Sequence, residues 1–344
     1  MPLPRLTFLA LEDDLDGCLA RVPAAPGVGQ FLGASRRHLM LAPAANLRKW
    51  AASHLGLGKP PPPGRRPKTN LAGIATTLAW ARTGSPFAQR LLYERLAAPL
   101  IPLSERRDLK PPAFLHLSPD DRFPRVTVRS AGPGRGALFG PFRNRSAAER
   151  ARDAVNRLFP LRPCDHAFEP DPALPLGVGC LYAQVRSCAA PCLARVSEAD
   201  YRALAVRAAD WLSDPAARTD APEVVPATVE SLDGARAVVL GLGRREVELY
   251  PVLAGRVLED AAVVTAPTEL EAAVARLHWS EEGGPDDWPW LAAWVGSARG
   301  RSSYVSVRGA GGGEGLVGAI RSVLPPRFAA LSGDGNVGPS QGEA

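Results

Sequence analysis

The chain contains five cysteines, and four of them lie close together between positions 164 and 192. This cluster of Cys164, Cys180, Cys188 and Cys192 constrains the fold more than any other feature, whereas Cys18 stands alone near the N-terminus. The sequence has no signal-like N-terminus and no run of about 18 uncharged apolar residues, so we expect a cytoplasmic protein without membrane contact. In a reducing compartment, clustered thiols are metal ligands, reactive groups or buried apolar side chains rather than disulfides.

The spacing of the four cysteines fits a soft metal site but does not identify the metal. Four thiolates can bind tetrahedral zinc or an iron–sulfur cluster. Zinc ribbons usually carry two short ligand pairs, and only Cys188 with Cys192 resembles such a pair. His166 could replace one ligand, although we expect it at the surface beside the loop. The alternative is that the cysteines are small buried apolar residues in an irregular loop.

Amphipathic helical patterns border the cysteine cluster on both sides. Ser146 with Glu149 and Ser197 with Asp200 are capping boxes, which predict that one helix begins at each of these serines. Apolar residues then recur at helical spacing in both segments, and the outer face of the first helix is rich in arginine. We therefore expect a helix on either side of the cysteine-bearing loop.

The charge of the chain points to a polyanionic partner. Its formal net charge is +6, with arginine far in excess of lysine. Arginine matches phosphate groups bidentately, and counterion release favours binding to nucleic acid. An arginine- and alanine-rich chain can equally reflect a GC-rich genome, so composition alone gives the two explanations equal weight.

The remaining segments predict loops and a small domain. Residues 56–68 are basic and rich in proline, which indicates a loop, and residues 214–228 form a plausible domain boundary. Beyond that boundary, alternating apolar patterns and a capped helix predict a small α+β domain, followed by a polar, glycine-rich tail that we expect to be disordered. We expect the acidic residues of this part to be solvated loop residues rather than metal ligands: Glu259, Asp260, Asp286 and Asp287.

Two long stretches around the cysteines carry an ordered series of motifs. They are "ALFGPFRNRSAAERARDAVNRLFPLRPCDHAF" (137–168) and "GCLYAQVRSCAAPCLARVSEADYRALAVRAADWL" (179–212). With their G-P-[FY] turn, their "LFPLR-x-C" helix end and their "C-L-x-x-Q-x-x-x-C-x-x-P-C" element, they resemble the Cys-rich region of the UvrC excinuclease family. In that family the four cysteines hold a [4Fe–4S] cluster. The resemblance implies that the same cluster, with zinc as the alternative, is held here by Cys164, Cys180, Cys188 and Cys192.

The first 105 residues can be aligned with the GIY-YIG nuclease domain with which the family begins. Arg48 and Glu94 stand where the family has its phosphate-binding arginine and its metal-binding carboxylate. The family's two tyrosines, motif glycine and lysine are replaced here by Gly29, Met40, Ala42 and Pro43. Losing the groups that handle the proton of the attacking water would remove roughly 10²–10⁴-fold of rate enhancement. The resemblance therefore implies a degenerate nuclease domain, which would bind Mg²⁺ only if some activity remains.

Three further parts of the family are not recognisable, namely the UvrB-binding helical hairpin, the RNase H-like second nuclease and the tandem helix-hairpin-helix pattern. We therefore do not expect a two-incision excinuclease. We expect an α+β protein with four segments: a degenerate GIY-YIG nuclease-like domain (1–105), a Cys-rich UvrC-like helical module (106–213), a small C-terminal α+β domain (229–328) and a disordered tail (329–344).

These features predict a UvrC-like DNA-binding protein of nucleotide excision repair or another DNA repair process, without nuclease activity and with repair proteins as further partners. The alternatives are a weak metal-dependent GIY-YIG endonuclease that uses Glu94, or a protein-binding scaffold. We expect one DNA-binding face across the Cys-rich module and the adjoining nuclease-like domain, although a solvated basic helix face would show the same pattern. The predicted contacts are Arg48, Lys49, Arg143, Arg145, Arg150, Arg157, Arg162, Arg186 and Arg195.

Overall fold

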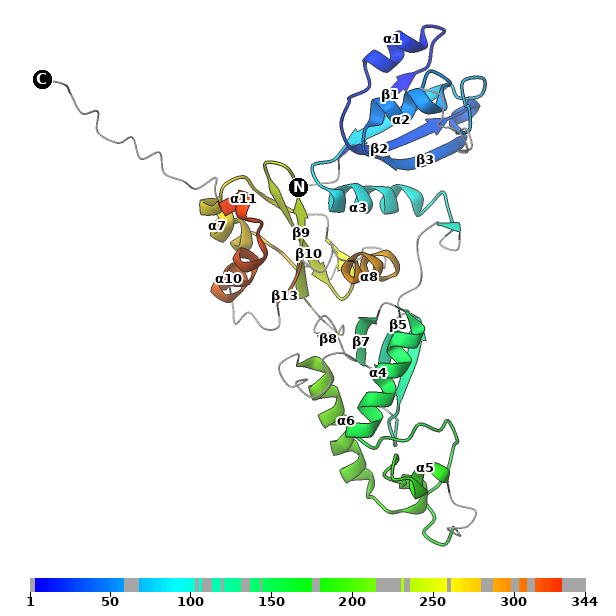
Figure 1. Cartoon of the computed structure of the whole chain (residues 1–344), viewed down its shortest axis with the longest axis vertical. Helices are drawn as coiled ribbons and strands as arrows, with labels where there is room; N and C mark the ends of the chain where they lie inside the picture. The colour runs from blue at the N-terminus through cyan, green and yellow to red at the C-terminus, as the bar shows by residue number, and fades with distance from the viewer. Residues whose placement is uncertain are drawn as a thin grey trace, which may run out of the picture.

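The computed structural model describes residues 4–58, 68–102, 105–106, 113–118, 121–130, 137–142, 144–174, 180–214, 230–231, 236–258, 261–279, 287–297, 303–307 and 313–329. These residues form helices and three antiparallel sheets, which confirms the predicted α+β class (Figure 1). None of the described helices is long and apolar enough to cross a membrane. The described residues leave out most of the predicted proline-rich loop and most of the predicted domain boundary. They also leave out nearly all of the predicted tail.

The N-terminal sheet has the strand order β1-β4-β2-β3. Every residue of β2 is buried, because α1 and α2 cover one face of the sheet and α3 covers the other. The edge strand β3 contains Pro43, a position that suits proline because an edge strand leaves half of its backbone groups outside the ladder. The elements are β1 (Thr7–Ala10), α1 (Leu15–Ala20), β2 (Gly27–Leu32), η1 (Ala34–Arg36), β3 (His38–Ala44), α2 (Leu47–His54), β4 (Thr77–Arg82) and α3 (Pro86–Ala97).

The middle sheet has the order β6-β5-β7-β8, and α4 and α6 pack on it around a core that includes the fully buried Tyr201. As predicted, α6 begins after Ser197, whose side chain accepts a hydrogen bond from the Asp200 backbone. The predicted start of α4 is wrong, because Asn144 caps this helix instead of Ser146. Asparagine caps as well as serine does, and its earlier position starts the helix at Arg145. The elements are β5 (Ala113–Leu117), β6 (Val126–Ser130), β7 (Ala137–Phe142), α4 (Arg145–Leu158), α6 (Glu198–Ser213) and β8 (Glu230–Ser231).

The C-terminal sheet has the order β11-β10-β9-β13, and β12 also pairs with β10. Its central strands are apolar on both faces because helices cover both of them. One face packs against α7, α10 and α11, and the other packs against α3 and α8. The elements are β9 (Arg236–Leu242), β10 (Val247–Leu253), β11 (Arg256–Val257), β12 (Ala262–Val264), η5 (Pro267–Glu269), α7 (Leu270–Ala275), α8 (Trp288–Gly296), β13 (Tyr304–Ser306), α10 (Gly313–Val323) and α11 (Pro326–Ala329).

Helix α3 connects the N-terminal and C-terminal sheets. Leu92 and Ala97 pack against the N-terminal sheet, whereas Phe87 and Leu91 pack against the C-terminal sheet. At the start of α3, the cap residue Ser85 donates a hydrogen bond to Glu248 of β10, and burial of this carboxyl group raises its pKa. One helix therefore contributes to two cores.

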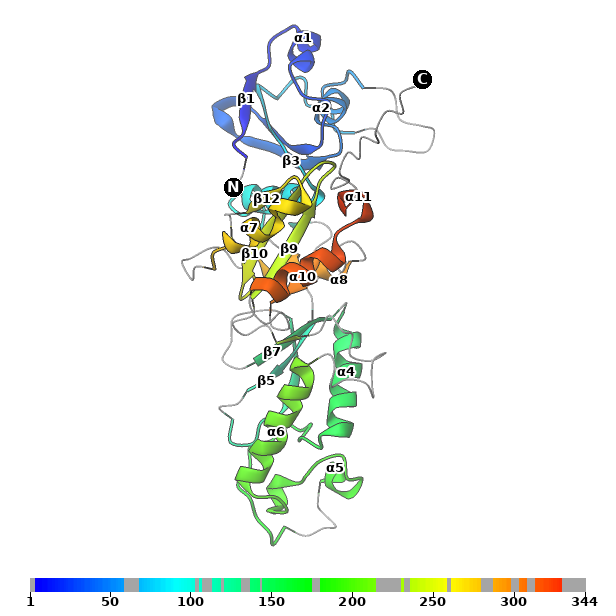
Figure 2. The same cartoon turned by 90° about the vertical axis from the view of Figure 1, so that its left-hand side faces the viewer.

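Helix α8 forms the next connection, because Ala292 packs against Phe114 and Leu138 of the middle sheet. As a result, the C-terminal sheet and its helices lie between the N-terminal and middle sheets (Figures 1 and 2). The predicted DNA-binding face runs directly from the Cys-rich module to the nuclease-like domain, but in the structure these two parts are not adjacent. The C-terminal domain stands between the two.

Candidate metal centre and its surroundings

The four clustered cysteines lie in irregular chain between α4 and α6. Cys164 is in the extended segment after α4, Cys180 precedes the short helix α5 (Leu181–Gln184), and Cys192 lies in η3 (Pro191–Leu193). Cys188 is buried, and the other three thiols are partly buried. In contrast, Cys18 is buried in α1 on the N-terminal sheet, apart from the group as predicted.

Arg162 and Tyr201 fix the segment that carries Cys164. The Arg162 guanidinium donates hydrogen bonds to the carbonyl oxygens of Phe123 and His166, both at 2.8 Å. The Tyr201 hydroxyl accepts from the Arg162 backbone N–H at 2.7 Å and donates to the Pro124 carbonyl at 3.0 Å. Because these bonds tie α6 to the chain just before Cys164, they determine where this cysteine lies. The predicted role of Arg162 as a DNA contact competes with this structural use of its guanidinium.

The loop around Cys188 and Cys192 contains unusual backbone conformations. Arg186, Ala190 and Ala194 all have left-handed φ values, of 56°, 55° and 51°. This conformation is unfavourable for residues with a Cβ atom, and such strain clusters at ligand-holding sites. The turn at Ala190 directs its N–H toward the Cys188 sulfur at 3.3 Å. A backbone donor of this kind stabilises a thiolate and tunes an iron–sulfur cluster.

The electrostatics of the thiols show that they share one neighbourhood. The pKa of Cys188 is raised to about 11, mainly by burial and in addition by the charges of Cys164, Cys180 and Cys192, while the Ala190 N–H acts in the opposite direction. Burial, followed by the charges of Cys180 and Cys164, likewise raises the pKa of Cys192. Mutual repulsion between thiolates is what a bound cation would relieve, so the donor set suits a thiophilic metal group. Among the described residues, however, no three metal-binding side chains converge closely enough to hold a single ion.

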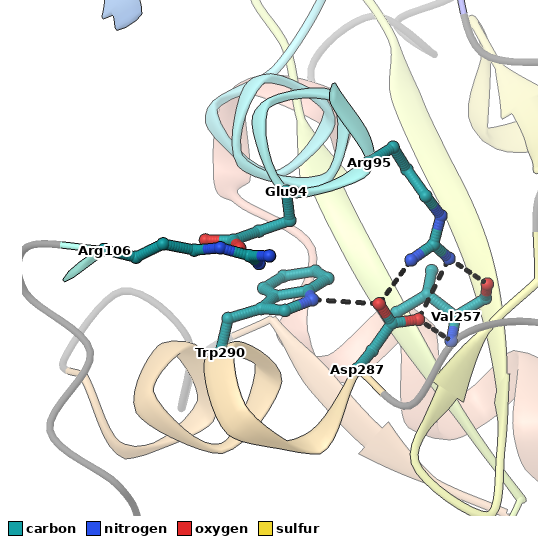
Figure 3. Close-up of polar contacts among 6 residues, drawn as sticks. All are labelled: Glu94, Arg95, Arg106, Val257, Asp287 and Trp290. Atoms are coloured by element: carbon teal, nitrogen blue, oxygen red, sulfur yellow. Dashed lines mark hydrogen bonds and ion pairs between the residues drawn. The ribbon is translucent and has the colours of Figure 1, made fainter. Parts of the chain in front are cut away.

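Glu94, the predicted remnant of a nuclease metal ligand, lies in a closed environment. Its side chain is only 2% exposed and forms ion pairs with Arg90 at 2.6 Å and with Arg106 at 2.8 Å. Figure 3 shows Glu94 and Arg106 facing one another beneath α3. Both carboxylate oxygens are therefore next to guanidinium groups, and such an environment opposes the approach of a divalent cation.

Arg48, the other remnant, holds the backbone at the end of α1. Its guanidinium donates to the carbonyl oxygens of Val22 at 2.7 Å and Ala20 at 3.1 Å. Two N–H groups on one edge of the guanidinium are thus bonded to the protein itself. Lys49, on the same helix, is exposed.

Trp50 occupies the space next to Gly29, where the family's first tyrosine would begin. A Cβ atom at Gly29 would lie 2.3 Å from the Trp50 ring, which also packs against Phe31 at a centroid distance of 4.9 Å. Trp50 therefore fills the core at this position and leaves no room for a side chain on residue 29. The motifs of the sequence do not indicate this role of Trp50, although an apolar residue four positions after the helix cap Asn46 is typical of core packing.

We expect Gly29→Ala to destabilise the N-terminal domain by about 1–3 kcal/mol, because the added methyl group overpacks the site against Trp50. The matched variant Gly73→Ala, where an added Cβ meets no atom within 4 Å, should change stability by less than about 0.5 kcal/mol. Urea unfolding monitored by tryptophan fluorescence measures both. Equal stability of the two variants would show that Trp50 moves aside without cost.

Asp287 corrects one expectation from the sequence, because it is buried rather than solvated. It is 1% exposed and forms a two-pronged ion pair with Arg95 of α3. It also accepts hydrogen bonds from the Val257 N–H at 2.8 Å and from the Trp290 indole at 2.9 Å (Figure 3). The Asp287 carboxylate therefore joins α3 to α8 and β11. The other three acidic residues, Glu259, Asp260 and Asp286, lie outside the described residues.

The structure places the remaining predicted DNA contacts around the middle sheet. Arg145, Arg150 and Arg157 are exposed on α4, where Arg145 also pairs with Glu149 at 2.9 Å. Arg186 and Arg195 are exposed in the cysteine-bearing loop, as is His166 after Cys164. Arg143 lies outside the described residues. Arg48 and Lys49 lie on α2. The C-terminal domain separates this helix from the middle sheet (Figure 2).

Comparison with known proteins confirms the resemblance predicted from the sequence. Residues 113–211 match the sequence family described as the UvrC/Cho excinuclease middle domain. The UvrABC system protein C of Sphingopyxis alaskensis is 32% identical over 225 residues, which cover 64% of this chain and 34% of that protein. Its counterpart in Mycolicibacterium vanbaalenii is 28% identical over 269 residues, which cover 75% of this chain and 39% of that protein.

The chain thus spans about a third of the length of the curated relatives it matches. No solved structure matches it. The matched region, residues 113–211, contains the four cysteines, α4, nearly all of α6, and the strands β5, β6 and β7 of the middle sheet.

Proposed function

We propose that this relative of the UvrABC system protein C is a DNA-binding protein of nucleotide excision repair that has no nuclease activity. The match of residues 113–211 to the excinuclease middle domain carries the proposal. The excess of basic residues and the exposed arginines of α4 and of the cysteine-bearing loop support it, because such groups can bind the phosphate backbone. Other excision-repair proteins would be its partners.

The absence of nuclease activity is the second part of the proposal. Glu94 is enclosed by two arginines, Arg48 bonds to backbone carbonyls, and Pro43 and Gly29 stand where the family has its lysine and first tyrosine. Helix α3, which carries Glu94, is in addition packed between two sheets. A divalent ion and a scissile phosphate therefore have no accessible carboxylate at this position.

The third part is a [4Fe–4S] cluster held by Cys164, Cys180, Cys188 and Cys192. Burial and the charges of the neighbouring thiols raise the pKa of Cys188 and of Cys192, which supports a shared site for the four cysteines. The resemblance of the cysteine motifs to those of the excinuclease family favours a cluster over zinc. When bound, the cluster would link the loop segments between α4 and α6 and so stabilise the module.

Salt-dependent DNA binding tests the proposal. Arg150 and Arg157 are seven residues apart on α4, hence on one face, and replacing both with alanine should reduce the slope of log K against log salt by about one unit per lost phosphate contact. The control is Arg122→Ala, because Glu169 and Glu198 already neutralise this exposed arginine. Binding is measured in the presence of Mg²⁺, so that any cleavage of the DNA would also be detected. Salt-independent binding, or no binding, would instead favour a protein scaffold.

A further inference from the structure

An exposed apolar cluster lies between two of the cysteines, at the end of the molecule farthest from the N-terminal sheet (Figure 1). Leu181 and Tyr182 of α5 and its cap residue Val185 are 67%, 43% and 63% exposed. Large apolar side chains exposed singly need no explanation, but three within five residues indicate a binding surface. We call these three residues the α5 knob.

The backbone that presents the α5 knob is fixed. Val185 donates its N–H to the Leu181 carbonyl at 3.0 Å, and Ser187 donates its N–H to the Tyr182 carbonyl at 2.9 Å. On the inner side of α5, Ala183 is buried against Ala190 and Leu193. A surface held in this way loses little conformational entropy when it binds.

The charge around the α5 knob indicates what it binds. Arg186 and Arg195 are exposed in the same loop, and the sequence has no acidic residue between Cys180 and Glu198. An apolar protrusion with adjacent arginines complements nucleic acid, in which phosphates surround the flat faces of the bases. Proteins use apolar side chains in this way as wedges between base steps, and aromatic rings stack on unpaired bases.

We propose that the α5 knob inserts into DNA at distorted sites, with Tyr182 stacked on an unpaired base and Leu181 and Val185 against its neighbours. This inference rests on the proposed DNA-binding function and adds a preference to it. Insertion requires unstacking, and the cost is lowest where the bases are already unpaired. The full chain should therefore bind a duplex with a short unpaired bubble more tightly than a fully paired duplex of the same length.

The test compares wild type, Tyr182→Ala and Tyr182→Phe on these two duplexes over a range of salt concentrations. Tyr182→Ala should weaken binding to the bubble by roughly 5- to 100-fold, with the salt slope unchanged, whereas Tyr182→Phe keeps the ring and should bind normally. The control is Val206→Ser, because Val206 is 58% exposed on α6 outside the α5 knob. A 2-aminopurine placed in the bubble should change its fluorescence on binding wild type but much less on binding Tyr182→Ala.

The outcomes separate the two proposals. If wild type binds DNA with a normal salt slope but Tyr182→Ala binds the bubble equally well, insertion is wrong and DNA binding stands. If wild type binds neither duplex, the proposed function fails and the inference fails with it. Val185→Ser repeats the test on a second exposed position, so that a folding defect in one variant does not decide the result.

Discussion

Asp287→Ala should destabilise the protein by about 3–5 kcal/mol, because it leaves the Arg95 guanidinium buried without its counter-ion. The side chains of Arg95 and Asp287 are only 13% and 2% exposed. The substitution also removes the acceptor for the Val257 N–H and the Trp290 indole, and unsatisfied buried donors add to the cost. Urea unfolding monitored by tryptophan fluorescence, to which Trp290 contributes, measures the loss.

A matched control separates burial from charge. Asp153→Ala also removes an aspartate paired with an arginine, but Arg152 and Asp153 are 34% and 53% exposed, so the loss should stay below about 1 kcal/mol. Asp287→Asn keeps an acceptor oxygen for Val257 and should fall between the two. A loss below about 1 kcal/mol for Asp287→Ala would mean that α3 and α8 are held together by apolar packing alone.

Cys188→Ser should remove the proposed iron–sulfur cluster. Protein purified without oxygen should carry about four irons and four sulfides per chain with the visible absorbance of a cluster, and the variant should lose nearly all of them. Cys188 is the buried member of the group, and its sulfur accepts the Ala190 N–H, so a serine there replaces a ligand without creating a large void. Iron, sulfide and zinc analysis of the same samples gives the result.

The control for this experiment is Cys18→Ser. Cys18 is also buried, but it lies on α1 and its thiol donates only a weak bond to the Ala10 carbonyl at 3.7 Å. This variant should keep its full iron content. Stoichiometric zinc in the wild-type protein would contradict the cluster and support the zinc alternative. Full iron content in Cys188→Ser would exclude Cys188 as a ligand.

The sequence by itself determined the features that depend on short segments of chain. Spacing and motif order grouped Cys164 with the other three cysteines, and the serine cap at Ser197 located the start of α6. Fold class and kinship with the excinuclease proteins follow from the same local patterns. Replacement of the family's tyrosines, glycine and lysine predicts a degenerate nuclease site, and this stays a prediction.

Only the tertiary structure decided how the charged residues of α2, α3 and the C-terminal domain are used. Arg95 and Asp287 are 192 positions apart, and each looks locally like a solvated charge. Arg48 likewise looks like a phosphate ligand until its guanidinium is placed against the carbonyls of Ala20 and Val22. Periodicity and capping record interactions within a few residues, whereas burial depends on which distant segment packs on a given face. For that reason the sequence indicated neither that α3 is shared between two sheets nor that the C-terminal domain separates the N-terminal sheet from the cysteine-bearing module.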